Sequence, residues 1–163
     1  MPENASVIKV RKARIGDIGF LADRAFELIK AHENYDEFFY AMTKSARQSY
    51  FSHFKKIIKN KAWLLVLAEA DKEIAGYALA AIEKRPPIYK LDKRCALHDI
   101  FVDEKFRGMG VSRKLFDKVL EFARENKTKM LQVIVDERNH KAIEIYKKFG
   151  FAEYDKTMAI KLP

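Results

Sequence analysis

The chain has 163 residues, enough for a sizeable hydrophobic core, and we expect residues 1–163 to form a single domain. Its one cysteine, Cys95, has no partner within the chain, which excludes a disulfide-stapled fold and favours a reducing compartment. The formal net charge of +9 favours an anionic ligand or partner.

The N-terminal residues Met1-Pro2-Glu3-Asn4 lack the basic and apolar regions of a secretory leader, and no apolar run approaches eighteen residues. We therefore expect a cytoplasmic protein that does not enter a membrane. Apolar and polar residues alternate over residues 7–13, which predicts a half-buried strand, and a helical pattern follows over residues 17–29. An acidic and aromatic stretch, residues 32–40, separates this helix from a second one over residues 43–59.

The middle of the chain is rich in β-formers. Residues 63–69 and 73–82 flank a short turn and predict a hairpin. Two prolines break residues 84–93, which predicts a loop. An apolar strand over residues 96–102, a helix over 111–125 and a strand over 130–135 then predict a βαβ unit with a right-handed crossover.

A short helix with Ala142, Tyr146 and Phe149 on one face follows this unit. Residues 151–154 and 157–162 then predict a C-terminal hairpin. The order of elements as a whole predicts a mixed α/β sheet with helices on both faces.

The segment Arg107-Gly108-Met109-Gly110-Val111-Ser112 has the form of an anion cradle between a strand and a helix. Glycines at alternate positions leave backbone N–H groups accessible, and the helix offers its unpaired N-terminal donors. A Walker loop requires Gly-Lys-Ser/Thr and a dinucleotide fingerprint requires a third glycine, whereas Val111-Ser112-Arg113 follows the second glycine here. The sequence therefore disfavours both nucleotide motifs, and a purely structural strand-to-helix turn is the alternative.

This segment resembles the pyrophosphate-binding loop of the GNAT superfamily of acyl-CoA-dependent N-acyltransferases, Arg/Gln-x-x-Gly-x-Gly/Ala, although Ser112 stands at its last position. A second resemblance lies about thirty residues downstream. It is carried by five residues that match Asn-x-x-Ala-x-x-x-Tyr-x-x-x-Gly-Phe, namely Asn139, Ala142, Tyr146, Gly150 and Phe151. Together with the strand before them and the predicted hairpin after them, the two resemblances cover residues 96–162.

The resemblance implies the α/β GNAT fold, a mixed sheet of six to seven strands in which the strands before and after the loop helix splay apart around a thioester. It also implies acetyl-CoA as co-substrate, no metal, and transfer of the acetyl group to a primary amine. A homodimer is a further expectation, because family members are often dimers. The residues that the resemblance assigns to coenzyme A are Ile100, Phe101, Val102, Arg107, Gly108, Met109, Gly110, Val111, Ser112, Arg113, Asn139, Ala142 and Tyr146.

Acetyl transfer to an amine requires a base, donors for the oxyanion and a proton for the leaving thiolate. His98 and Asp99 are the candidate bases, and we favour His98 because its ordinary pKa lies near neutrality. Strand alternation allows only one of the two to face the substrate unless a bulge intervenes. Main-chain N–H groups around Phe101 and Val102 are the oxyanion donors, and Tyr146 is the proton donor that the resemblance implies.

Each of these residues also has a structural interpretation. His98 can be a hydrogen-bonded strand residue, Tyr146 a core tyrosine and Asn139 a helix N-cap.

The acceptor pocket of the family is shaped by the loop after its first helix. Here that loop carries Glu33, Tyr35, Asp36 and Glu37, whose carboxylates and aromatic ring suit a cation. We therefore expect a small cationic, polyamine-like amine as acceptor, and a solvated turn followed by core aromatics is the structural alternative.

Other functions remain open at this point. An enzyme that acetylates protein N-termini or lysines is one, and a non-catalytic acyl-CoA-binding or RNA-associated module is another. The basic charge admits a nucleic-acid partner, but the chain has no aromatic RNA-binding signature, so we do not expect one.

Overall fold

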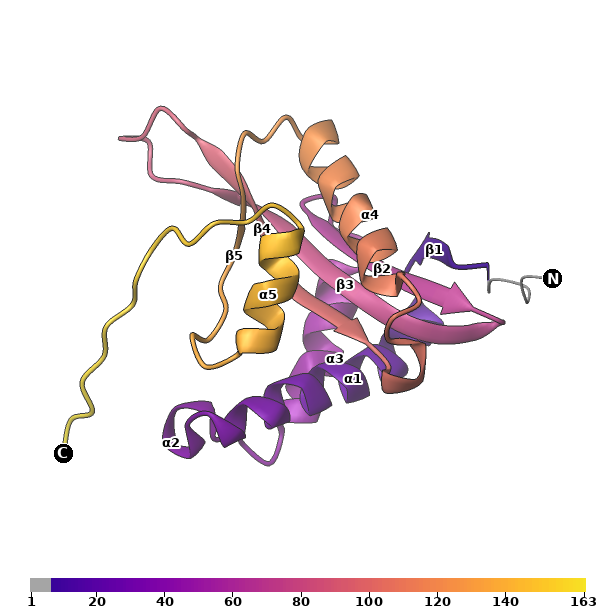
Figure 1. Ribbon diagram of the computed structural model, residues 1–163, viewed down its shortest axis with the longest axis horizontal. Coiled ribbons are helices and arrows are strands. Elements are labelled where there is room, and N and C mark those ends of the chain that lie inside the picture. The colour runs from indigo at the N-terminus through magenta and orange to yellow at the C-terminus, as the bar shows by residue number, and fades with distance from the viewer. Residues whose placement is uncertain (1–6) are drawn as a thin grey trace.

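The computed structural model describes residues 7–163, which form a five-stranded sheet in the order β1-β2-β3-β4-β5 with helices on both faces (Figure 1). The expectation about a leader falls on residues 1–6, outside the described residues. The strands are β1 (Lys9–Lys12), β2 (Trp63–Ala70), β3 (Glu73–Lys84), β4 (Lys93–Val102) and β5 (Leu131–Val133). The helices are α1 (Ile18–Lys30), α2 (Glu37–Tyr40), α3 (Ala46–Ile57), α4 (Val111–Glu125) and α5 (His140–Lys148), with 3-10 turns at Ile15–Asp17, Ala31–Asn34 and Glu104–Phe106.

The first four strands form an antiparallel meander. Between β2 and β3, Asp71 and Lys72 have φ angles of 51° and 69°, and two successive left-handed residues are what a tight hairpin turn requires. The hairpin predicted from residues 63–82 is therefore confirmed. β4 and β5 pair in parallel with α4 between them, which also confirms the predicted βαβ unit.

Two hydrophobic cores lie on opposite faces of the sheet. Leu64 and Val66 of β2 pack with Leu115 of α4, whereas Leu65 between them packs with Phe54 of α3. Because helices cover both faces, β2 and β3 are buried at nearly every position of their middle parts. Helices therefore cover both faces of the sheet, as predicted.

The sheet has five strands among the described residues, where the resemblance implied six or seven, and the predicted C-terminal hairpin is wrong. Residues 151–163 carry no regular secondary structure and run away from the sheet (Figure 1). Alternating apolar residues do not form a strand by themselves, because a hairpin without an apolar surface beneath it is marginal in water. β5 is also shorter than residues 130–135, since it pairs with β4 only opposite Cys95–Leu97.

Cys95 packs as a small buried apolar residue. It is fully buried in β4, and burial raises the pKa of its thiol to about 11. The thiol is therefore protonated at neutral pH and poorly reactive. No helix within residues 7–163 combines the length and apolar character needed to cross a membrane.

Candidate active site

The segment between β4 and α4 brings backbone donors together at the start of a helix. Gly108 and Gly110 have φ angles of 79° and 82°, a left-handed conformation that residues with a side chain adopt only with strain. No side chain caps α4, so the N–H groups of its first turn lack a capping acceptor. A Cβ built on either glycine would meet no protein atom within 4 Å. Open space therefore lies beside these donors, a shape that suits an anion.

Two arginines flank this loop at the surface. Arg107 Nη1 lies 3.8 Å from Glu104 Oε1, and Arg113 Nε lies 2.9 Å from Asp117 Oδ1. Exposed ion pairs of this kind contribute little to stability, so either guanidinium can exchange its carboxylate for a phosphate at little cost. The remaining loop residues divide by exposure: Val111 is buried and anchors α4, Ser112 is half-buried and Met109 is 40% exposed.

β4 loses its neighbour on one side beyond Leu97. β3 pairs with β4 as far as Val102, whereas β5 pairs with it only at Cys95, Ala96 and Leu97. The splay that the resemblance implied is therefore present. Along residues 98–102 one backbone edge has no ladder partner from β5, and its N–H and C=O groups are available to an amide-bearing ligand. Ile100, Phe101 and Val102, the residues assigned to coenzyme A on this strand, all lie in this segment. Because successive residues of a strand direct their N–H and C=O groups to opposite edges, alternate members of the three face the open side.

A β-bulge places two titratable residues on the same face of the sheet. Asp99 lies opposite Leu79 and Leu97 opposite Ala80, so His98 has no partner on β3. As a result both side chains contact the core under α1 and α3. The His98 ring stacks on Trp63 with 5.2 Å between centroids, and the Tyr77 hydroxyl donates to Asp99 Oδ2 at 3.3 Å. Strict alternation would let only one of His98 and Asp99 face the substrate, whereas the bulge lets both lie on the same face.

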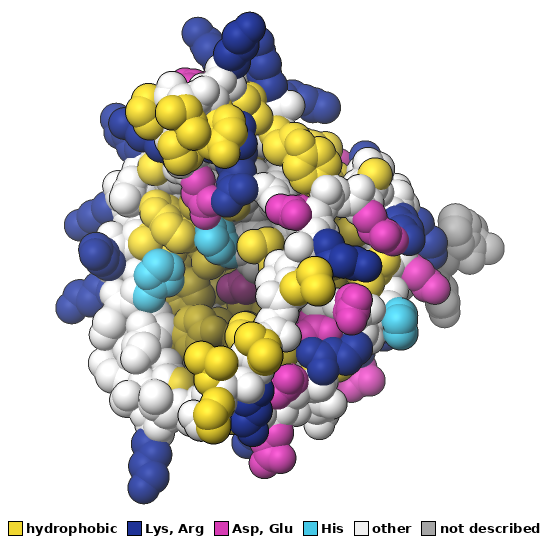
Figure 2. All heavy atoms as spheres, turned by 90° about the vertical axis from the view of Figure 1, so that its left-hand side faces the viewer, with side chains coloured by type: hydrophobic (Ala, Val, Ile, Leu, Met, Phe, Trp, Pro, Cys, Tyr) yellow, Lys and Arg dark blue, Asp and Glu magenta, His cyan; other side chains and the backbone are white. Residues whose placement is uncertain are grey.

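Asp99 lies close to three tyrosines. Burial raises the pKa of Tyr50 and Tyr146 to about 12 and raises the pKa of Tyr77 well above its ordinary value, and the charge of Asp99 adds to all three shifts. Their hydroxyls therefore stay protonated at neutral pH. Figure 2 shows a hollow in the corresponding side of the molecule, where an acidic side chain lies deep among hydrophobic ones and two histidines lie near the edge.

The carboxylate of Asp99 is held without a cation. Burial raises its pKa, and the Tyr77 hydrogen bond and the charges of His98 and His32 oppose that shift. Among the described residues no lysine or arginine forms an ion pair with it. A desolvated carboxylate in this position gains from any cation that enters the hollow, and its raised pKa also improves it as a proton acceptor.

His98 belongs to a network at the rim of the same region. Its Nε2 lies 3.1 Å from Glu83 Oε1, and Arg94 Nη2 lies 3.0 Å from Glu83 Oε2. Trp63, on β2, also packs edge to face against His53 of α3, with 5.3 Å between the ring centroids. Burial, with His98 and a nearby lysine, lowers the pKa of His53. The imidazole of His98 is thus fixed on two sides, by a carboxylate and by an indole.

α5 supplies Tyr146 across the gap between β4 and β5. Asn139 Oδ1 accepts the Ala142 N–H at 3.2 Å, which confirms Asn139 as the helix N-cap. The Tyr146 ring packs edge to face on Phe151 at 5.6 Å and against the core under α4. Its hydroxyl forms no hydrogen bond with a described residue, so Tyr146 packs as a core ring and keeps a free O–H.

The loop expected to shape the acceptor pocket, residues 32–40, forms hydrogen bonds with the connection between β5 and α5. The Tyr40 hydroxyl donates to Asp136 Oδ2 at 2.8 Å, and Arg138 donates to the Tyr35 carbonyl. Asp36 caps α2 by accepting the Phe39 N–H at 2.9 Å. The other two predicted carboxylates, Glu33 and Glu37, form no ion pair with a residue in the described part of the chain.

Sequence reasoning missed the aromatic and ionic residues around His98 and Asp99. Tyr50 and His53 come from α3, Trp63 from β2 and Tyr77 from β3, so no local motif joins them. The available signal was Tyr77 itself, a large polar ring in a strand whose other residues between the charged ends are small or aliphatic.

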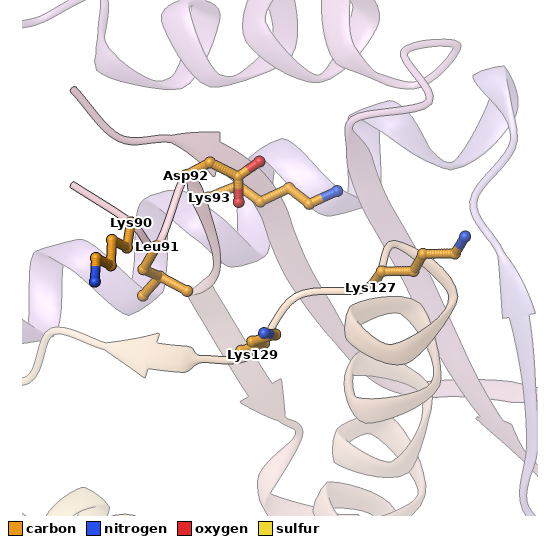
Figure 3. Close-up of a pocket in the computed structure, with 6 residues that line it drawn as sticks. All are labelled: Lys90, Leu91, Asp92, Lys93, Lys127 and Lys129. Atoms are coloured by element: carbon orange, nitrogen blue, oxygen red, sulfur yellow. The ribbon is translucent and has the colours of Figure 1, made fainter. Parts of the chain in front are cut away.

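A separate pocket of about 300 Å³ lies at the far end of α4 from the glycine loop. Figure 3 shows its lysines pointing in different directions rather than toward a common point. It is lined by Lys90, Leu91, Asp92, Lys93, Lys127 and Lys129. Within residues 7–163 no three His, Cys, Asp or Glu side chains gather closely enough to hold a metal ion.

Known proteins resemble the chain in sequence and in fold. The sequence model of the acetyltransferase (GNAT) family matches residues 28–151. An uncharacterized N-acetyltransferase of Methanocaldococcus jannaschii is 30% identical over 130 residues, 76% of this chain and 53% of the relative, so the chain spans about half that relative's length. One of Archaeoglobus fulgidus is 25% identical over 139 residues, 85% of this chain and 89% of the relative. A solved aminoglycoside N-acetyltransferase in complex with CoA has a TM-score of 0.78 at 16% identity, covering 99% of this chain and 98% of its own.

Proposed function

The chain belongs to the acetyltransferase (GNAT) family, and from that premise we propose that it transfers the acetyl group of acetyl-CoA to the primary amine of a small cationic, polyamine-like acceptor. The free edge of β4 is the observation that carries this proposal. It runs from a glycine loop suited to a pyrophosphate to Asp99, a carboxylate suited to an ammonium group. A single elongated co-substrate lying along this edge would have its phosphates at one end and its thioester beside the acceptor.

The glycine loop supports acetyl-CoA as that co-substrate. The N–H groups at the start of α4 would hold the pyrophosphate, and Arg107 and Arg113 would neutralise its charge. The N–H and C=O groups that the segment Ile100 to Val102 directs toward the open edge of β4 would pair with the amides of the pantetheine arm. The structurally similar aminoglycoside N-acetyltransferase was solved in complex with CoA, which supports CoA as the ligand by analogy.

Activation of the acceptor requires removal of a proton. An amine with a pKa near 10.4 is neutral in about one molecule in 2,500 at pH 7, a cost of about 4.6 kcal/mol. Asp99 would bind the ammonium form and then take its proton. Burial favours this transfer because it brings the pKa of the Asp99 carboxyl group closer to the pKa of the amine. His98, the base favoured from sequence, is held at the rim by Glu83 and Trp63 and is the competing candidate.

The bond changes then follow in order. The neutral amine nitrogen attacks the thioester carbonyl carbon, and free N–H groups near Phe101 and Val102 stabilise the oxyanion. Collapse of this intermediate breaks the C–S bond, and Tyr146 donates its hydroxyl proton to the departing thiolate. The former amine nitrogen loses its second proton as the amide forms, that proton returns to the Tyr146 oxygen through solvent, and Asp99 releases the proton that it took from the ammonium to solvent. The raised pKa of Tyr146 supports this role, since the hydroxyl still carries its proton at neutral pH.

The charge of the site supports a cationic acceptor over a neutral one. Asp99 has no cationic partner in the described chain, Tyr77 and Tyr50 lie near it, and Trp63 stacks on the neighbouring His98. Carboxylate attraction and cation–π contact both favour an ammonium group at such a place. Glu33 and Glu37, unpaired at the neighbouring loop, would add long-range attraction.

A thiol-release assay with acetyl-CoA tests this function. The acceptor panel should contain polyamines, aminoglycosides, amino acids, and peptides with free N-termini or lysines. We expect the highest kcat/KM with a polyamine or another small polycation. Glu121→Gln, an exposed carboxylate paired with Lys118 on α4, is the matched control for charge removal and should leave every rate unchanged.

The same panel separates the alternatives. Preference for a peptide would favour a protein N-terminal or lysine acetyltransferase. Tight binding of acetyl-CoA without turnover of any amine would favour a non-catalytic acyl-CoA-binding module, and would contradict the proposed chemistry.

A further inference from the structure

Lys161 brings a primary amine to the loop that is expected to receive the acceptor, residues 32–40. Its ammonium nitrogen lies 4.0 Å from the ring centroid of Phe38 on α2, within the range of a cation–π contact. The same loop carries three carboxylates, at Glu33, Asp36 and Glu37. The chain thus presents its own lysine, a cationic primary amine, to an acidic and aromatic loop.

The segment that carries Lys161 starts beside the proposed active site. The ring of Phe151 lies 5.6 Å, between centroids, from the ring of Tyr146, the proposed proton donor. Residues 152–163 are exposed and have no regular secondary structure. They run down the left-hand side of Figure 1, and this side faces the viewer in Figure 2, where the hollow opens. The segment and the hollow therefore lie on the same side of the molecule.

The length of the segment lets Lys161 reach the thioester. Lys161 follows Phe151 by ten residues, and an extended chain of that length spans at most about 35 Å. A short tether keeps the group that it carries at an effective concentration of about a millimolar. Lys161 is therefore favoured over a dilute free amine, without any additional contact.

We propose that the protein acetylates its own Lys161 in the absence of a free acceptor. This inference rests on the proposed function, because it uses the same acetyl-CoA site, base and proton donor. Asp99 takes one proton from the Lys161 ammonium, and the neutral Nζ attacks the thioester carbonyl carbon.

The remaining bond changes balance as they do for a free amine. A C–N bond forms, the C–S bond breaks, and the thiolate takes the hydroxyl proton of Tyr146. The second proton of the Lys161 nitrogen returns to the Tyr146 oxygen through solvent, and Asp99 releases its proton to solvent. The products are Nε-acetylated Lys161 and CoA, and nothing is oxidised or reduced.

Acetylation also changes the acceptor loop. The modified Lys161 has no charge and loses its cation–π contact with Phe38. The segment then competes less well with a free amine for the loop. We therefore expect the acetylated protein to have a KM for the amine about threefold lower than the unmodified protein, the size of effect that one exposed cation–π contact supports.

Peptide mass spectrometry after incubation of the full chain with acetyl-CoA alone tests the proposal. We expect an acetyl group on Lys161, formed at a rate that does not depend on protein concentration, because the transfer takes place within one chain. Lys161→Arg keeps the positive charge but offers no acetylatable amine, and should lose this label. Lys156→Arg, in the same exposed segment, is the matched control and should be labelled at Lys161 like the parent.

A mixing experiment separates transfer within one chain from transfer between chains. Chains with Asp99→Asn and His98→Gln lack both candidate bases but keep Lys161, whereas Lys161→Arg chains keep the bases but lack the acceptor. We expect no more label on Lys161 in the mixture than in the base-deficient chains alone, where it should form about a thousandfold more slowly than in the parent.

Three results would overturn self-acetylation within one chain. They are labelling in the mixture, equal labelling of the parent and the base-deficient chains, and an unlabelled Lys161 in the parent. A polyamine assay on the same preparation keeps this inference apart from the proposed function. A parent that acetylates a polyamine but not Lys161 contradicts only the inference, whereas a parent that acetylates neither contradicts both.

Discussion

The two halves of the proposed site, at either end of the free β4 edge, are built by different means. The glycine loop uses the backbone of consecutive residues, 107–113, and its shape depends on two left-handed glycines and an uncapped helix. The region around Asp99 uses side chains from α3, β2, β3 and α5, which meet only in the folded chain. A common co-substrate can be bound by a local motif, whereas a particular acceptor requires a surface assembled from many elements.

Asp99→Asn should have the largest effect on activity and tests the side-chain half directly. Removal of the proton acceptor should lower kcat/KM for the amine about a thousandfold, within the range for a general base. Acetyl-CoA affinity, measured by calorimetry, should not change.

His98→Gln is the comparison for this variant. A large loss of turnover in His98→Gln together with a small one in Asp99→Asn would assign the base to His98, as the sequence suggested.

Tyr146→Phe removes the one hydroxyl that α5 contributes to the proposed site. Turnover should fall about a hundredfold, because a general acid is lost while the ring and its packing on Phe151 remain. Pre-steady-state kinetics should show that the chemical step has slowed. If the chemical step limits turnover and the rate of the variant is within twofold of the parent, Tyr146 has a packing role only.

Gly110→Val tests the backbone half. A side chain at this left-handed position should weaken acetyl-CoA binding about tenfold, because it fills the space beside the N–H donors and strains the loop. Gly150→Val, at another left-handed glycine with open space around it, controls for strain alone. Equal acetyl-CoA affinity in the two folded variants would contradict the pyrophosphate role of the loop.

Asp99→Asn should also stabilise the fold, by about 1 kcal/mol at pH 7, a common size for a single stabilising substitution. The pKa of Asp99 is raised in the folded state, so the protonated form is favoured there, and the parent loses stability as pH rises through that folded pKa. The variant avoids this loss. Urea denaturation should therefore show the difference at pH 7 but not below the ordinary carboxyl pKa. A destabilised variant at pH 7 would contradict the burial effect.

Glu33→Gln with Glu37→Gln should have the smallest effect. The KM of the amine should rise about threefold, since partly exposed charges are screened and each contributes modestly. Asp36 is left in place because it caps α2. The KM of acetyl-CoA is the internal control, and an unchanged KM and salt dependence for the amine would remove this loop from acceptor recognition.

The local parts of the protein could be predicted because they depend on neighbouring residues. The α4 pattern over residues 111–125 matches the helix to the residue, and the turn at Asp71 and Lys72 follows from chain geometry. Asn139 caps α5 through a hydrogen bond to a residue three positions away. Interactions of this range are encoded in spacing, so a single sequence reveals them.

Sequence by itself determined the order of elements, the glycine loop and the family resemblance, because each rests on contacts between residues close along the chain. Tertiary structure decided the rest. The bulge that brings His98 and Asp99 to one face depends on how β3 and β4 align, and the cluster around Asp99 depends on four elements packed together. The strand pattern of residues 151–162 is visible in the sequence, but a strand forms only when it pairs with another strand, and this segment pairs with no described strand.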